Sequence, residues 1–371
     1  MFLTTYDWIF AGFFFIFGTM VGSFLNVCIY RMPLDLSVNE PKRSFCPHCK
    51  KQIPWYQNIP IWSWLILGGK CANCKKAIPV RYLLVEALTG ICFLTLWLVF
   101  PWQLALPYMV LLGIFIPATF IDIEHYIIPD ELTIGGTVAG ILLALLFPPL
   151  MGANIWWISG LYSLLGAATG FFTLWGVVEL GKLAFGKKAL KLDAPSTFHW
   201  HRIHDDATMK VGDDSLQWSE IFSRESDQLL LEASDIKIDG KKLHDTSIKF
   251  FYNRLVTSKK TIDLMTIETI EAKATRLVIP REAMGFGDVK FLACIGAFLG
   301  WKAVFFTILA SSLIGSLVGI TTLLLRRREW SAKLPFGPYL AFGAVLWMFF
   351  GQNLLDWYWN TFLAPPELFF H

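Results

Sequence analysis

Long apolar runs are the feature that most constrains the fold of this chain, because several reach the length needed to cross a lipid bilayer. A helix rises about 1.5 Å per residue, so about 20 apolar residues span a hydrocarbon core of about 30 Å. Hydrophobic residues make up 55% of the 371 residues and charged residues only 16%, which argues against a soluble enzyme. We therefore expect an all-α polytopic membrane protein with about eight transmembrane helices. The expected spans are residues 8–30, 82–100, 103–122, 132–148, 156–185, 289–300, 302–325 and 335–351.

The distribution of Lys and Arg predicts the orientation of these spans, because positive charge is retained on the cytoplasmic side. Basic residues gather in the loop 31–81 and in segment 326–333, whereas the opposite ends of the spans carry almost only Lys302. We therefore expect the loop in the cytoplasm and both termini outside. The first run, 8–30, is too long for a signal-peptide core, and no basic region precedes it, so we expect a retained helix. The net charge of +3 follows from the loop bias and gives no reason to expect a nucleic-acid partner.

Residues 186–279 interrupt the apolar pattern, with 15 basic and 15 acidic side chains. The second half of this segment alternates in the manner of strands, and the Asp-Gly pair at 239–240 predicts a tight turn. We expect a small β-rich cytoplasmic domain here, inserted between membrane helices. The segment also holds His199, His201 and His204. With no cysteine nearby, we interpret these histidines as polar residues of a solvated loop rather than as metal ligands.

These patterns divide the chain into six parts, and no internal repeat is visible in the sequence. The parts are the first transmembrane helix (1–30), the basic cytoplasmic loop (31–81), the second to fifth helices (82–185), the soluble insertion (186–279), the sixth to eighth helices (280–351) and a C-terminal tail (352–371).

Two Cys-x-x-Cys pairs, CPHC and CANC, lie in the basic loop. Their cysteines are Cys46, Cys49, Cys71 and Cys74. Four thiolates suit a tetrahedral Zn²⁺, which would organise a loop too small to build its own hydrophobic core, so we expect a zinc-ribbon-like site. Disulfides are the alternative, which a reducing cytoplasm disfavours, and His48 is the alternative to one thiolate. The other cysteines, Cys28, Cys92 and Cys294, lie in apolar runs and are interpreted as small buried hydrophobic residues.

Two aspartates lie at the same predicted membrane edge. Asp122 ends the third span, and Asp288 stands in GFGDVK directly before the sixth. Two carboxylates in contact cannot both ionise readily, so one keeps a proton, as a pair must do to activate water and protonate a leaving amine. Asp130 and Glu124 are rivals of Asp122, although Pro129 places Asp130 at a turn before the fourth span. Any of these acids alone is also explained as a helix cap or as a group facing headgroup water.

The chain resembles the type IV prepilin peptidases, which are bifunctional leader peptidases and N-methyltransferases. The resemblance covers nearly all of the chain outside 186–279. The matching stretches are GSFLNVCIYRMP (22–33), the loop and helix from CPHC to ALTG (46–90), IDIEHYIIPDELT (121–133), REAMGFGDVKFLACIGAFLGW (281–301) and PFGPYLAFG (335–343).

The resemblance implies that Asp122, which opens a D-x₆-P-D motif, and Asp288 of Gly-x-Gly-Asp form the catalytic pair of an aspartic peptidase. It implies a prepilin or pseudopilin substrate, whose basic leader is cut at the cytoplasmic face of the bacterial inner membrane. It further implies methylation of the new N-terminus with S-adenosylmethionine. No glycine-rich loop of the Rossmann kind is present, so we assign no residues to S-adenosylmethionine. The family's two aspartates are usually closer in sequence, so residues 186–279 are expected to be an added domain.

Two other classes of function are compatible with intramembrane acids. An ion-coupled transporter would use them as proton carriers, but the acids of this chain cluster at one membrane edge, and no repeat or broken helix marks a midplane site. A membrane scaffold would use the Cys loop and the β-rich insertion to bind partners and would need the acids only as helix caps. Loss of an activity on a single Asp substitution, with folding unchanged, distinguishes an enzyme from a scaffold.

Overall fold

The protein consists of a helical unit and a β-sheet unit. A computed structural model describes residues 5–41, 43–185, 187–203, 206–212, 214–218, 228–243, 245–257, 260–280, 285–325, 334–358 and 360–361. The expectations for His204, segment 326–333 and most of the C-terminal tail therefore lie outside the described residues. The chain divides into two compact units, Met1–Trp175 with Gly285–His371, and Gly176–Met284.

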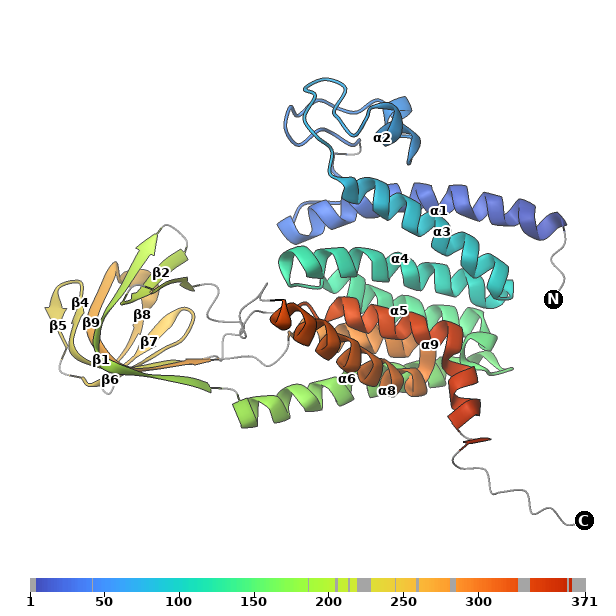
Figure 1. Cartoon of the computed structure of the whole chain (residues 1–371). Coiled ribbons are helices and arrows are strands. Elements are labelled where there is room, and N and C mark those ends of the chain that lie inside the picture. The colour runs from blue at the N-terminus through green and yellow to red at the C-terminus, as the bar shows by residue number, and fades with distance from the viewer. Residues whose placement is uncertain are drawn as a thin grey trace, which may run out of the picture. The chain divides into compact units, whose positions relative to one another are not determined.

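Helices make up most of the described chain, as the apolar runs predict (Figure 1). They are α1 Thr5–Arg31, α2 Trp62–Ile66, α3 Val80–Val99, α4 Trp102–His125, α5 Asp130–Leu146, α6 Trp156–Phe185, α8 Phe286–Leu324 and α9 Gly337–Tyr358. Short 3₁₀ turns lie at Met32–Leu34, Trp55–Gln57, Pro148–Met151 and Leu264–Thr266.

Five of these helical segments are long and apolar enough to cross a membrane. They are Tyr6–Leu34, Val80–Val99, Trp102–His125, Trp156–Gly181 and Phe286–Leu324. α5 has 17 residues and the apolar part of α9 is Gly337–Gly351, so both fall short of that length. Length and composition alone therefore give five spanning helices in the described chain, fewer than the eight expected.

α8 is a single run of 39 residues that contains one break, at Gly300. Gly300 has φ 78° and ψ 172°, a conformation that glycine adopts at no steric cost. Beyond the break the chain folds back, since the side chain of Val304 lies 3.1 Å from where a Cβ on Gly296 would stand. In a straight helix, residues eight apart would be separated by about 12 Å. The two arms thus correspond to the predicted sixth and seventh spans, and the first arm begins at Phe286 rather than at 289.

α6 packs directly against the first arm of α8, backbone to backbone. A Cβ on Gly166 would lie 2.1 Å from the carbonyl oxygen of Gly296, a distance that no side chain tolerates. The hydroxyl of Ser163 donates a hydrogen bond of 2.6 Å to the carbonyl oxygen of Ala297. Small residues at such a crossing allow the close van der Waals contact that associates helices in lipid.

The second unit is an antiparallel sheet in the order β3-β2-β1-β9-β4-β6-β7-β8, with β5 paired to β4. Its strands are β1 Lys187–Ile203, β2 Asp206–Val211, β3 Asp214–Gln217, β4 Leu229–Ile238, β5 Lys241–Lys242, β6 Ser247–Phe250, β7 Arg254–Val256, β8 Thr261–Asp263 and β9 Thr269–Pro280. The predicted Asp-Gly turn is confirmed, because Asp239 and Gly240 both have positive φ and join β4 to β5. Phe198, Trp218 and Phe250 belong to the unit's own buried core.

The interpretation of His199 and His201 as loop residues is wrong. His199 and His201 lie within β1, where they alternate with the buried Phe198 and Trp200 and project from the opposite face. His199 lies 3.8 Å from Glu271 of β9, and both side chains are about half exposed. The alternation of aromatic and histidine residues has the period of two that is typical of a strand.

Because the sheet unit has its own core, we predict that residues 190–275 can be replaced by a short flexible linker without unfolding the helical unit. Lengthening or shortening a connection costs little loop entropy. The shortened protein should elute as a single species in detergent and keep the thermal unfolding midpoint of the helical unit. Aggregation of every linker variant would show that the helical unit depends on the sheet.

Candidate active site

Asp122 lies in the last turn of α4. The helix ends at His125, and Tyr126 takes a left-handed conformation that lets its N–H donate to the carbonyl oxygen of Asp122 at 2.9 Å. The Asp122 side chain is turned inward, so that the residue is 5% exposed. Its Oδ2 accepts a hydrogen bond of 2.9 Å from the N–H of Gly337, the first residue of α9. The backbone of α9 therefore fixes the orientation of this carboxylate.

Asp288 lies in the first turn of α8, three residues after Gly285. It is 8% exposed, and its Oδ1 atom is buried and has no hydrogen-bond donor among the described residues. The turn that carries Asp288 borders the same space as the Asp122 carboxylate, because Ile128 lies against both Gly287 and the Gly337 that binds Asp122. Ile128 closes the same space, because Cβ atoms on Gly287 and Gly337 would stand 3.4 Å and 3.0 Å from its side chain. The structure thus brings together the two predicted aspartates, 166 residues apart in the sequence.

The two rival acids have other partners and face outward. Lys290 Nζ lies 2.7 Å and 2.8 Å from the two carboxylate oxygens of Asp130, and the Asp130 side chain is 58% exposed. Glu124 pairs with Arg81 at the start of α3. Both ion pairs join separate helices, which is a sufficient explanation for these acids.

The chemistry available to the buried pair follows from its surroundings. Both carboxylates are largely removed from water, and the buried Oδ1 of Asp288 has no hydrogen-bond partner within the described chain. Two such groups side by side share a proton more readily than they both ionise. The arrangement suits general acid–base activation of a water molecule at the end of three helices.

The four predicted cysteines also converge. The sulfur atoms of Cys46, Cys49, Cys71 and Cys74 all lie within 4.8 Å of one another, and all four cysteines are free thiols. The Cys46 and Cys74 sulfurs are 3.8 Å apart, whereas a disulfide would bring them to about 2.05 Å. A tetrahedral ion with metal–sulfur bonds of about 2.3 Å requires a sulfur separation of about 3.8 Å. The cluster therefore fits one tetrahedral metal ion.

The two Cys-x-x-Cys segments fold alike, which supports this role. In the first segment, the N–H of Cys46 donates to the carbonyl oxygen of Lys51, and the N–H of Lys50 donates to the carbonyl oxygen of Cys46. In the second segment, the N–H groups of Cys71 and Lys75 donate in the same way. Lys50 and Lys75 both have positive φ, near 60°. Backbone hydrogen bonds from Cys74 and Asn73 lower the pKa of the Cys71 thiol, whereas burial and the neighbouring thiols raise the pKa of Cys74, so the sulfurs of the cluster titrate as one group.

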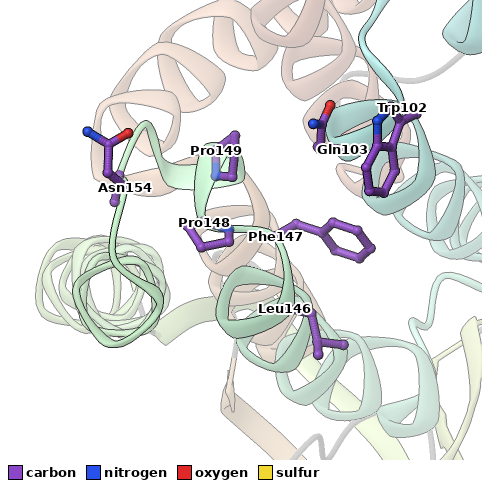
Figure 2. A pocket seen from close by; sticks show the side chains of 8 residues that line it. Trp102, Gln103, Leu146, Phe147, Pro148, Pro149 and Asn154 are labelled. Atoms are coloured by element: carbon purple, nitrogen blue, oxygen red, sulfur yellow. The ribbon is translucent and has the colours of Figure 1, made fainter.

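A hollow of about 360 Å³ lies at the other end of the helical unit and takes no part in this site (Figure 2). It is lined by Trp102, Gln103, Leu146, Phe147, Pro148, Pro149, Ala153 and Asn154. Trp102 begins α4 and Asp122 lies in its last turn, about 30 Å away along the axis. None of the lining side chains titrates near neutral pH, so the hollow offers no acid–base chemistry.

Sequence reasoning missed two contributors to the aspartate site. Gly337 stands in the quoted stretch PFGPYLAFG but received no role, because only the fold shows that its N–H meets Asp122. Lys290 follows Asp288 by two residues, and its pairing with Asp130 could not be read from a separation of 160 positions.

Two family models match this chain, and several relatives share one name. Residues 16–100 match the bacterial peptidase A24 N-terminal domain, and residues 109–190 with 249–320 match the type IV leader peptidase family. A prepilin leader peptidase/N-methyltransferase of Aeromonas hydrophila is 29% identical over 96% of both chains. A protein of the same name from Pseudomonas aeruginosa is 27% identical over 92% of this chain and 90% of its own length. Another from Myxococcus xanthus is 44% identical over 49% of this chain and 52% of its own length. No solved structure matches this chain significantly.

Between them the two family models take in both Cys-x-x-Cys pairs, both buried aspartates and the helices that carry them. The chain therefore belongs to the type IV leader peptidase family.

Proposed function

We propose that this protein is a membrane-embedded aspartic endopeptidase that removes the basic leader of type IV prepilins or pseudopilins. The observation that carries the proposal is the pair of buried carboxylates, Asp122 and Asp288, which border one space around Ile128 in a chain of this family. One carboxylate takes a proton from the attacking water, and the other, protonated, gives one to the departing amine. Neither a transporter nor a scaffold is favoured by the family or by its relatives' names.

The topology that we propose places this chemistry at the cytoplasmic edge of the bacterial inner membrane. Eight crossings result if α5, α9 and both arms of α8 each cross the bilayer. The ends of α1 and α4 and the starts of α3, α5, α8 and α9 then lie on one side, together with the basic loop 31–81. A prepilin whose leader stays in the cytoplasm and whose apolar helix enters the bilayer would present its scissile bond at this level.

We also propose that the protein methylates the new N-terminus with S-adenosylmethionine, because its relatives are named N-methyltransferases as well as leader peptidases. We assign no residues to this step. A pilin supplied already cleaved, with labelled S-adenosylmethionine, tests methylation separately from cleavage. Transfer of one labelled methyl group to its N-terminal amine is the expected product.

Conversion of Asp122 or Asp288 to Asn should each lower leader cleavage by roughly 100- to 10,000-fold, because an amide can neither accept the proton of water nor share one with its neighbour. Purified protein and a prepilin substrate, with products resolved by mass, give the rates. Expression and metal content should not change.

Asp130→Asn is the matched control, since it removes a carboxylate at the same end of the helices but from an exposed ion pair worth less than about 1 kcal/mol. Its cleavage rate should stay close to that of the wild type. Strong cleavage by both of the other single variants would exclude an aspartic mechanism.

Gly337→Ala should lower cleavage roughly 10- to 100-fold, because the added Cβ would stand 2.8 Å from Asp122 Oδ2 and displace the carboxylate. Gly113→Ala, in the same helix as Asp122 but with open space around the new methyl group, should leave cleavage unchanged. Equal rates for the two variants would show that the contact does not position Asp122.

We propose that the four-cysteine cluster holds a structural Zn²⁺, since its sulfur spacing fits and its role is to order a loop with little core. The purified chain should then contain about one zinc per molecule. Cys46→Ser or Cys71→Ser should lower the zinc content and increase proteolysis of the loop, whereas Cys92→Ser in α3 should change neither. Protein made with ample zinc that carries none by metal analysis would contradict the assignment.

A further inference from the structure

The segment between the two Cys-x-x-Cys pairs differs in character from the rest of the basic loop. Residues 52–69, QIPWYQNIPIWSWLILGG, contain no Asp, Glu, Lys or Arg, whereas Lys50, Lys51 and Lys70 flank them directly. Large apolar side chains project outward from this segment. They are Trp55, Tyr56, Ile59, Trp62, Leu65 and Ile66, and Trp62 and Ile66 are 66% and 78% exposed. For a loop in water, exposing this much apolar surface would be unfavourable in free energy.

The segment is held beside a membrane helix rather than beyond its end. The N–H of Ile61 donates a hydrogen bond of 2.7 Å to the Glu86 carboxylate, and Ile61 directly precedes α2. Glu86 lies six residues into α3, about 9 Å along its axis. α3 has 20 residues, which are all needed to cross a hydrocarbon core of about 30 Å. In Figure 1 the loop that carries α2 stands to one side of α1 and α3.

Many backbone N–H groups of the segment are hydrogen-bonded within the protein, which suits a low-dielectric surrounding. In lipid, peptide groups must find partners within the protein, since no water replaces them. The N–H groups of this segment that donate to loop carbonyls, to Ser63 or to Glu86 are those of Ile53, Gln57, Asn58, Ile59, Ile61, Trp62, Ser63, Leu65, Leu67, Gly68 and Gly69. The indole N–H of Trp64 also donates to the carbonyl oxygen of Ile78, at 3.3 Å.

We propose that residues 52–69 form an interfacial anchor that buries its Trp, Leu and Ile side chains in the cytoplasmic leaflet of the bilayer. The expected depth matches that of helices lying about 5–10 Å into the boundary between headgroups and acyl chains. The flanking Lys50, Lys51 and Lys70 extend toward anionic headgroups. The anchor fixes the four-cysteine cluster at the membrane surface, and it requires only that α3 crosses the bilayer, not that the protein cleaves a prepilin.

The wild-type protein itself provides the first test. It is reconstituted in vesicles of phosphatidylethanolamine and phosphatidylglycerol that include a lipid with a diazirine in the upper acyl chain. After illumination, trypsin releases residues 52–70 as one peptide and residues 44–50, from the same loop, as another. We expect lipid adducts to be several-fold more abundant on 52–70 than on 44–50. Equal labelling of the two peptides would overturn the proposal.

A second test places the contact at single residues. Photoreactive benzoylphenylalanine replaces Trp62, the exposed Ile91 of α3 or the exposed His48 of the cysteine cluster, one at a time. Illumination in the same vesicles should attach lipid at positions 62 and 91 but not at 48, as read from the intact mass. The measurement is repeated with a prepilin substrate present. Attachment of the prepilin in place of lipid at position 62 would show that this surface binds substrate and would overturn the anchor, while leaving the peptidase proposal intact.

Discussion

Within lipid, every backbone polar group must find its partner inside the protein, and this constraint decides where a buried acidic site can be built. The backbone groups of a spanning helix pair with one another, so free backbone N–H and C=O groups are available mainly at helix ends. The candidate site uses three such ends. Asp122 comes from the last turn of α4, Asp288 from the first turn of α8, and the N–H that binds Asp122 from the first residue of α9. A free N–H at a helix start is the donor that the helix itself cannot use.

The same helix ends carry two kinds of acidic residue, which differ in their exposure and in their partners. Asp130 and Glu124 are exposed and are paired with Lys290 and Arg81, so they join helices by short ion pairs. Asp122 and Asp288 are buried and have no basic side chain bonded to them in the described chain. A cation beside either carboxylate would hold it ionised, and the pair could not then share a proton. The ion pairs around the site thus serve its geometry without entering its chemistry.

Two parts of the chain that are not spanning helices gain their order in different ways. The sheet unit has a core of its own, in which the ring of Phe250 contacts the rings of Phe198 and Trp218. The loop 31–81 has almost no core, and its order comes from local bonds. Two repeated Cys turns bring four sulfurs together, and the buried Arg31 donates to the carbonyl oxygens of Ser37, Val38 and Pro41. A loop built in this way can leave its apolar side chains free to face outward.

The sequence alone determined the features that depend on neighbouring residues. Hydropathy located the helices, the division between the sixth and seventh runs corresponds to the break at Gly300, the Asp-Gly pair predicted the turn before β5, and the two Cys-x-x-Cys pairs predicted one cluster. These signals are local, since helix length, turn geometry and ligand spacing are set within a few residues. Only the tertiary structure decided which acids meet, because Asp122 contacts a residue 215 positions away and Asp130 one 160 positions away. It also turned His199 and His201 into strand residues, since pairing of β1 with β9 fixes their alternation. Such contacts depend on how helices and strands pack, and a single sequence carries no separate signal for each of them.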